Sequence, residues 1–189
     1  MHLDHDVSTP GRFAQLCDIM RTVQIALLTT THRRGGPHTR PVQTLCVDEH
    51  EQTLWFFTDR GSPKALELDV DRHVTLGYSK PSKGLFAVIY GVGRVLHDPA
   101  QARRLWRLEQ RAYYPVGPSD PRLAVLRVQI ERAEYWIAPG RLSYWVAAAR
   151  AAVTGTAEQR IGENCKLNLE EHRPAETSHD SQSVTEPGL

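Results

Sequence analysis

The sequence predicts a mainly β domain, in which an antiparallel sheet closes or nearly closes on itself and a few short helices flank it. Three observations support this fold class. Runs rich in β-branched and aromatic residues recur along the chain, and turns containing Gly or Pro separate them. Helical patterns do not alternate regularly with these runs, which argues against a parallel sheet.

The composition indicates one globular domain with appendages. The chain has 189 residues, of which 40% are hydrophobic and 24% charged. A net charge of +1 does not favour a nucleic-acid partner, and the longest apolar runs, such as residues 85–92, are too short to span a membrane. The start of the chain does not resemble a signal peptide. Three widely separated cysteines argue against a disulfide framework and a zinc site, and favour a cytoplasmic location.

Four segments can be distinguished by their patterns. We expect residues 1–11 to be a flexible N-terminus and residues 12–140 to form the β-barrel domain. Residues 141–171 are expected to form a C-terminal helix and extension, because residues 142–153 are rich in Ala. Residues 172–189 are polar and contain many Ser, Thr, Glu and Pro residues, so we expect a disordered tail.

The first half of the domain reads as a helix followed by strands. Apolar residues at helical spacing predict a helix over 12–22. A β-rich run predicts a strand over 25–31, and the Gly-Gly turn after it predicts a return strand over 39–47. A third strand over 54–57 would complete a three-stranded meander.

The second half contains more strands and one capped helix. Strands are expected over 74–79 and 85–96, and Gly91 and Gly93 in the latter indicate a bulge, a bend or close approach of a ligand. Asp98 and Pro99 predict a helix start, and residues 113–118 break that helix. Two last strands are expected over 123–130 and 133–137.

The turn after the aromatic strand is the candidate binding element. Thr58, Arg60, Ser62 and Lys64 place two hydroxyls and two cations between a strand and a helix that starts at Pro63. Hydroxyls, a lysine and a helix N-terminus are suited to an anion, so we hypothesise that this turn binds the phosphate of a cofactor. Taken singly, these residues fit turn caps and a solvated lysine better than a binding site; their combination after an aromatic strand favours phosphate binding.

Catalytic motifs do not stand out in the sequence. It lacks a nucleophile elbow, a paired-carboxylate motif, metal-spaced His and Cys residues and a Walker sequence. The Gly-x-Gly at 91–93 is not followed by a helix and a third Gly, which excludes a Rossmann fingerprint. We therefore name no catalytic residue and no metal site, and expect a cofactor to carry any chemistry.

Several motifs together resemble a known family. They are ALLTT at 26–30, TRPV at 39–42, LWFFTDRGSPK at 54–64 and YGVGRV at 90–95. This order resembles the flavin-binding split β-barrels of antiparallel Greek-key type that are related to pyridoxamine 5'-phosphate oxidase. Within them the chain is most similar to the bacterial general stress proteins, over residues 12–169.

The resemblance implies a homodimer with FMN at the subunit interface, FAD being the alternative cofactor. It assigns the phosphate to Thr58, Ser62 and Lys64, and the phosphate or the ribityl chain to Arg40. It assigns the isoalloxazine ring to Pro41, Val42 and Gln43. It also implies that Trp55, Phe56 and Phe57 line the barrel side, with Trp106 and Trp136 as candidates for a pocket wall. From the residues alone, Trp106 fits core packing or a dimer contact better, and Trp136 fits core and pocket equally.

The chain also departs from the pyridoxamine phosphate oxidases proper. Those enzymes carry an Arg-x-His substrate motif on the last strand, whereas residues 134–140 here read EYWIAPG. Oxidation of vitamin B6 is therefore not expected. Two functions stay open: an FMN-dependent oxidoreductase, or a stress protein that stores, buffers or senses flavin without turnover. A barrel that binds haem or a deazaflavin is a third alternative.

Overall fold

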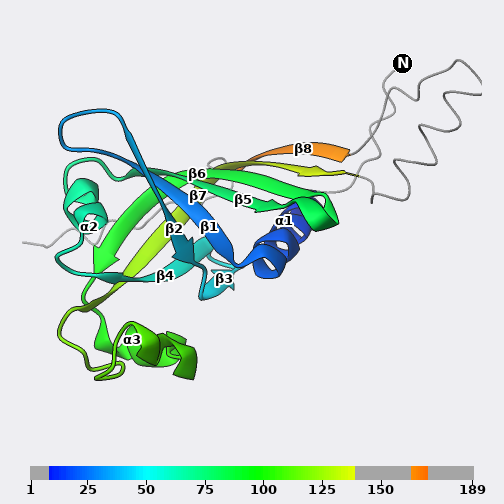
Figure 1. Cartoon of the computed structure of the whole chain (residues 1–189). Coiled ribbons are helices and arrows are strands. Elements are labelled where there is room, and N and C mark those ends of the chain that lie inside the picture. Colours follow the sequence, from blue (N-terminus) through cyan, green and yellow to red (C-terminus); the bar gives the residue numbers. More distant parts are fainter. Residues whose placement is uncertain (1–8, 139–162, 170–189) are drawn as a thin grey trace, which may run out of the picture.

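The computed structural model describes residues 9–138 and 163–169 (Figure 1). Within these ranges the chain forms an eight-stranded sheet whose pairings are all antiparallel, which confirms the predicted fold class. The strand order is β2-β1-β5-β6-β7-β4-β3, and β8 also pairs with β7. Among the described helices, none has the length and apolar character needed to cross a membrane.

The elements follow one another along the chain in a fixed order. The first half contains α1 (Thr9–Val23), β1 (Ile25–Thr31), β2 (Pro37–Gln43), β3 (Cys46–Asp48), β4 (Thr53–Asp59) and α2 (Pro63–Leu68). The second half contains β5 (His73–Lys80), the 3-10 turn η1 (Pro81–Lys83), β6 (Leu85–Leu96), α3 (Pro99–Leu105), the 3-10 turn η2 (Leu108–Ala112), β7 (Leu123–Ile137) and β8 (Glu163–Asn168).

Local sequence signals act as expected at two places. The Asp98 carboxylate caps α3 by accepting hydrogen bonds from the backbone N–H groups of Ala100 and Gln101, at 3.0 and 2.9 Å. The register of β6 against β7 shifts between Tyr90 and Gly91, and the extra residue is Glu131, so the bulge lies in β7 opposite Gly91. A side chain at Gly91 would collide with the Gln129 carbonyl oxygen on β7, so this position requires glycine.

The predicted three-stranded meander is wrong. The expected strand over 39–47 divides into β2 and β3, because the backbone changes partner between them. The Thr44 N–H donates to the Gln24 carbonyl at 2.8 Å, whereas the Leu45 N–H donates to the Trp55 carbonyl at 2.9 Å. β2 therefore pairs with β1, β3 pairs with β4, and β2 lies far from β4 in the sheet order.

The C-terminal part of the sheet also differs from expectation. The two strands predicted over 123–130 and 133–137 form one strand, β7, because a bulge at Glu131 accommodates the change of register between them. β8 was not predicted, and it pairs with β7 from Arg132 to Ile137. The helix predicted over 142–153, the N-terminal residues 1–8 and the tail over 172–189 lie outside the described residues.

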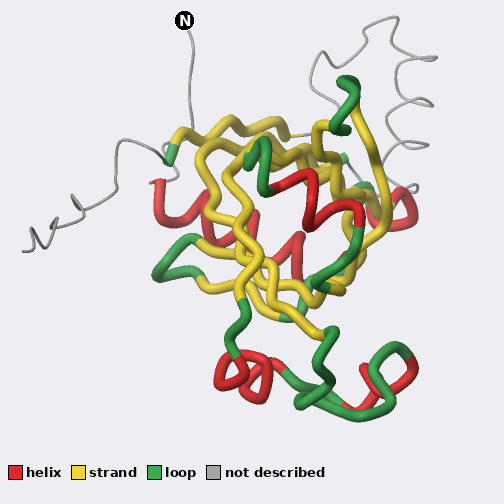
Figure 2. Tube along the Cα trace, turned by 90° about the vertical axis from the view of Figure 1, so that its left-hand side faces the viewer, coloured by secondary structure: helices red, strands yellow, loops and turns green. Residues whose placement is uncertain are grey.

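The sheet curls around a common interior (Figure 2). The apolar face of α1 packs into this interior through Phe13, Leu16, Ile19 and Met20, all of which are buried. A second, smaller hydrophobic cluster lies between the sheet and α3, the helix that projects below the sheet in Figures 1 and 2. In this cluster Tyr114 and Val125 are buried, and Phe57 on β4 packs against them. The second cluster forms one side of the candidate site.

Candidate functional site

A cavity of about 390 Å³ opens where β2, the β4–α2 turn and the segment after η2 meet. Its lining consists of Ile25, Pro41, Val42, Gln43, Leu45, Phe57, Thr58, Asp59, Lys64, Gln110, Tyr113 and Tyr114. β2 and β4 are distant in the strand order, but the curl of the sheet brings Val42 and Phe57 to the same cavity. Of the twelve residues that the sequence assigned to the cofactor, Pro41, Val42, Gln43, Phe57, Thr58 and Lys64 line it.

One part of the cavity is apolar and aromatic. Phe57 contacts Tyr114 edge-to-face, with 6.2 Å between ring centroids, and Trp106 lies behind it at 5.9 Å. Tyr114 is buried, and burial, together with the negative charge of Asp59, raises the pKa of its phenol to about 12. The phenol is therefore neutral at physiological pH. A wall of this kind suits a flat aromatic ligand.

Two side-chain amides lie at the same cavity. The Gln110 Nε2 donates a hydrogen bond of 3.1 Å to the Gln43 Oε1, which joins η2 to the end of β2. Gln110 is buried, and both residues line the cavity. The amide pair leaves donor and acceptor groups beside the apolar wall, where they can bond the polar edge of a ring.

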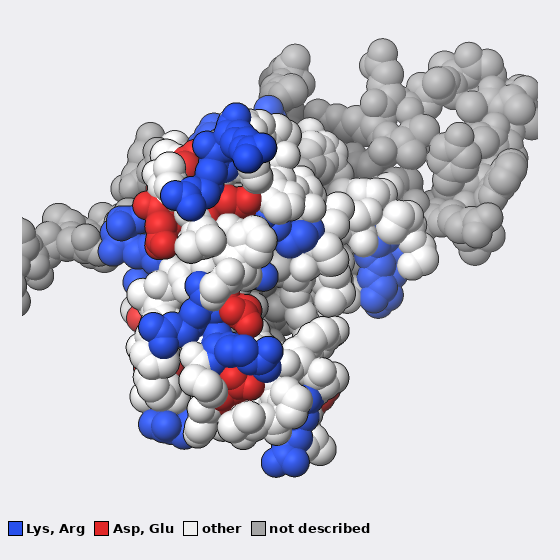
Figure 3. All heavy atoms as spheres, turned by 60° about the vertical axis from the view of Figure 1, so that its left-hand side comes forward, with Lys and Arg blue, Asp and Glu red and all other residues white. Residues whose placement is uncertain are grey.

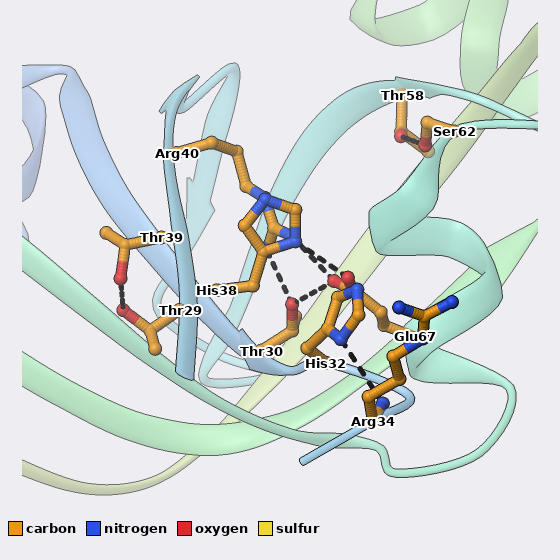
Figure 4. Close-up of polar contacts among 10 residues, drawn as sticks. All are labelled: Thr29, Thr30, His32, Arg34, His38, Thr39, Arg40, Thr58, Ser62 and Glu67. Carbon is orange, nitrogen blue, oxygen red and sulfur yellow. Dashed lines mark hydrogen bonds and ion pairs between the residues drawn. The ribbon is translucent and has the colours of Figure 1, made fainter. Parts of the chain in front are cut away.

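The turn between β4 and α2 supplies hydroxyls. Ser62 occupies the N-cap position of α2, but its side chain does not cap the helix. Instead the Ser62 Oγ lies 3.1 Å from the Thr58 Oγ1 (Figure 4). Because α2 has only six residues, its dipole is small, and the hydroxyls and Lys64 have to supply most of the attraction for an anion.

Lys64 is the cation that lines the cavity. It is half-buried, and within residues 9–138 and 163–169 no carboxylate lies within ion-pair distance of it. Burial lowers the pKa of Lys64, and the positive charge of Arg40 lowers it further, whereas Asp59 and Glu67 oppose the shift. A half-buried ammonium group in this position gains from an anionic ligand.

Arg40 does not line the cavity, although the family resemblance assigned it to the phosphate or the ribityl chain. Its guanidinium donates to the Thr30 Oγ1 at 2.5 Å and to the Glu67 Oε2 at 2.6 Å. Only 17% of the Arg40 side chain is exposed. Figure 4 shows Arg40 directed toward Thr30 and Glu67, with Thr58 near the end of β4 and Ser62 at the start of α2.

The remaining assigned aromatic residues also lie away from the cavity. Phe56 is fully buried in the main core, because side chains alternate along β4 and only its neighbours face the other side. Trp55 stacks under the Arg127 guanidinium, with 5.9 Å to the ring centroid. Trp136 pairs with Phe86 near the far end of β7. Trp106 does not line the cavity but packs behind its aromatic wall, with 5.9 Å between its ring centroid and that of Phe57.

The structure adds lining residues that the sequence did not assign: Ile25, Leu45, Asp59, Gln110, Tyr113 and Tyr114. Asp59 lies at the end of β4, at the turn that the sequence already indicated as a binding element. Tyr113 and Tyr114 lie where the sequence predicted a helix break. Both positions could therefore have been considered from the sequence. Gln110 offered no such signal, because a glutamine in a polar helical segment looks like a surface residue. On the face drawn in Figure 3, basic and acidic side chains of the described residues are interspersed.

Comparison with known proteins shows relatives of the same fold. The curated protein bli-3 of Neurospora crassa is 24% identical over 164 residues, covering 82% of this chain and 78% of that protein. A general stress FMN/FAD binding protein from Xanthomonas citri has a crystal structure that is 29% identical, with a TM-score of 0.58, covering 65% of this chain and 86% of that chain. A Clostridium acetobutylicum protein related to general stress protein 26, of the pyridoxinephosphate oxidase family, is 18% identical with a TM-score of 0.63. The match covers 86% of this chain and 97% of that chain.

A family model described as pyridoxamine 5'-phosphate oxidase like matches residues 12–159, which is most of the chain. The general stress proteins among the solved structures share the curled antiparallel sheet seen here. The chain belongs to the pyridoxamine 5'-phosphate oxidase-like family.

Proposed function

We propose that this protein binds FMN in the cavity between β2, the β4–α2 turn and the segment after η2. One observation carries the proposal: an aromatic wall lies in the same cavity as Thr58 and Lys64. Ser62 does not line the cavity, but its hydroxyl lies 3.1 Å from that of Thr58. Its volume of about 390 Å³ falls in the usual range for small-molecule sites. The similar Xanthomonas citri protein is described as FMN/FAD binding, which supports a flavin.

The residues divide into two groups toward such a ligand. Lys64 and the hydroxyls of Thr58 and Ser62 would bind the phosphate, and Phe57 with Val42 would contact the ring. Gln43 and Gln110 would bond the polar edge of the ring through their amides. When bound, the flavin would supply hydride-transfer chemistry, while this chain would hold and orient it.

We also propose that the protein is a homodimer with the flavin at the interface. Ile25 and Leu27 on β1 are 51% and 54% exposed, and Leu27 pairs with Pro41 on β2. Ile25 and Pro41 also line the cavity, so this apolar surface continues to the cavity mouth. A second copy that covers Leu27 would cover the flavin as well. The three cysteines are free, which supports a cytoplasmic location.

The visible spectrum of the purified protein tests the flavin. We expect flavin absorption bands, and mass analysis of the compound released on heating should identify FMN. If FAD is found instead, the proposed cofactor changes but the proposed site stays the same. A colourless protein that does not take up added FMN would contradict the proposal. A haem spectrum would show that the barrel binds haem instead of FMN.

Turnover is tested separately. We propose that the protein is an FMN-dependent oxidoreductase, because a bound flavin would supply hydride-transfer chemistry. The bound flavin would be reduced with a nicotinamide cofactor and then mixed with air and candidate acceptors. Reduction and reoxidation at a useful rate would support an enzyme. Failure of reduction would favour the second function, a stress protein that stores, buffers or senses flavin.

A further inference from the structure

The Glu67 carboxylate on α2 joins three side chains from two strands. Only 2% of the Glu67 side chain is exposed. It accepts hydrogen bonds from Thr30 on β1 at 2.5 Å and from Arg40 on β2 at 2.6 Å, and it lies 2.7 Å from the His38 ring nitrogen on β2 (Figure 4). A buried carboxylate with this many partners is held firmly in one position.

These contacts fix two walls of the cavity relative to each other. β2 is the edge strand of the sheet, and β1 is its strand partner in the described part of the chain. Glu67 ties β2 to α2, and α2 carries Lys64. The Arg40 guanidinium is also bonded to Thr30, so two acceptors define the plane of the guanidinium.

Arg40 keeps part of its hydrogen-bonding capacity. A guanidinium has five N–H donors, and the Thr30 and Glu67 bonds use two of them. Its charge lies close enough to Lys64 to lower the pKa of that ammonium group. Glu67 follows Lys64 by three residues on α2, so the 2.6 Å bond from Arg40 to Glu67 brings the guanidinium within about one helical turn of Lys64. One of these two cations is thus oriented by a buried carboxylate.

We propose that Glu67 is a positioning residue for the phosphate end of the site. It holds the Arg40 guanidinium beside Lys64, so that Arg40 attracts the ligand phosphate even though it does not form the cavity lining. The inference rests on the proposed flavin function. It adds that Glu67, which does not line the cavity, determines how well the phosphate, and not the ring, is bound.

A neighbouring carboxylate offers a matched control. Asp71 follows α2 and accepts a hydrogen bond of 2.8 Å from Thr31 on β1, and it lies 2.7 Å from the His73 ring nitrogen. It therefore ties the α2–β5 connection to β1 much as Glu67 ties α2 to β1 and β2. Asp71 has no bond to Arg40, so its loss should not act on the phosphate.

The test compares two ligands that share the ring, FMN and riboflavin, of which only FMN carries a phosphate. Both would be titrated by flavin fluorescence against the full chain and its Glu67→Gln and Asp71→Asn variants. We expect Glu67→Gln to weaken FMN about tenfold, the effect of losing one well-oriented charge-assisted contact, and to change riboflavin less than about twofold. Asp71→Asn should leave the FMN-to-riboflavin ratio unchanged.

Arg40 variants show whether Glu67 acts through Arg40. Arg40→Gln should weaken FMN selectively, and adding Glu67→Gln to it should cause no further loss. The double variant removes both charges, so neither charge is left buried without a partner. If Glu67→Gln alone does not fold, the comparison of the double variant with Arg40→Gln still tests the inference. A further selective loss in the double variant would overturn the inference.

Other results separate this inference from the proposed function. If Glu67→Gln weakens FMN and riboflavin equally, Glu67 only stabilises the fold. If it tightens FMN, the carboxylate merely repels the phosphate, and the inference is also wrong. If the wild-type protein binds neither ligand, the flavin function itself fails, and the role of Glu67 fails with it.

Discussion

The side-chain amides of Gln110 and Gln43 meet at 3.1 Å although the two residues belong to separate parts of the fold, η2 and the end of β2. This hydrogen bond closes one side of the cavity, which both residues line. It also places a buried amide beside the aromatic wall. The end of the cavity that we propose for the flavin ring thus depends on a contact between segments that are distant in sequence.

Loss of the Gln110 amide should weaken the binding of the flavin ring. We expect Gln110→Ala to lower FMN and riboflavin affinity by a similar factor, on the order of 1 kcal/mol for one neutral hydrogen bond. Isothermal titration with each ligand would measure this change. Gln101→Ala, in α3 and away from the cavity lining, is the control. A loss confined to FMN would contradict the placement of Gln110 at the ring.

The opposite selectivity is expected for Lys64. Lys64→Ala should weaken FMN by about 1–3 kcal/mol, because a charge-assisted bond to the phosphate is lost, and should leave riboflavin unchanged. Competition between the two ligands would show the change directly. Lys83→Ala removes an exposed lysine of η1 and serves as the control. Unchanged FMN affinity in Lys64→Ala would remove the central claim about the phosphate.

Glu67 should make the fold sensitive to acid. Burial alone would raise the pKa of Glu67, but hydrogen bonds from His38, Thr30 and Arg40 outweigh it and lower the pKa from 4.5 to about 2. The unfolded chain therefore binds a proton more readily than the folded one. The stabilisation by ionised Glu67 is complete above pH 4.5, and it is lost as the pH falls from 4.5 to about 2.

Urea denaturation at several pH values tests this expectation. The difference in free energy of unfolding between wild type and Glu67→Gln should be largest near neutral pH and should shrink across that acidic window. The glutamine does not titrate, so the variant itself supplies the reference. A difference that stays constant with pH would show that Glu67 is not ionised in the fold.

A charge at Leu27 should disrupt the proposed dimer. Leu27→Lys places an ammonium group on the exposed apolar surface of β1, and burying it against a second copy would be costly. We expect sedimentation to show a monomer with weakened flavin binding. Val70→Lys, at a position that is 69% exposed beyond α2, is the matched control. A wild-type monomer, or an unchanged Leu27→Lys dimer, would contradict the interface.

Local patterns predicted most elements because they depend on neighbouring residues. The run over 25–31 became β1 with the expected bounds, Asp98 caps α3, and α2 starts at Pro63 as expected. The strand over 39–47 was predicted wrongly, because its division depends on Thr44 and Leu45 bonding to different partners elsewhere in the chain. A hydrophobic pattern does not show which strand supplies those hydrogen-bond partners.

The β-rich class, the family resemblance and the polar residues of the turn after β4 could all be predicted from local sequence. Thr58, Ser62 and Lys64 are close together along the chain, so their spacing already placed two hydroxyls and a cation at one turn. The contact of Arg40 with Glu67, and the part of the cavity lined by Gln110 and Tyr114, became visible only in the folded chain. These contacts join residues distant in sequence, and they form only because the sheet curls until β2 and β4 face one cavity.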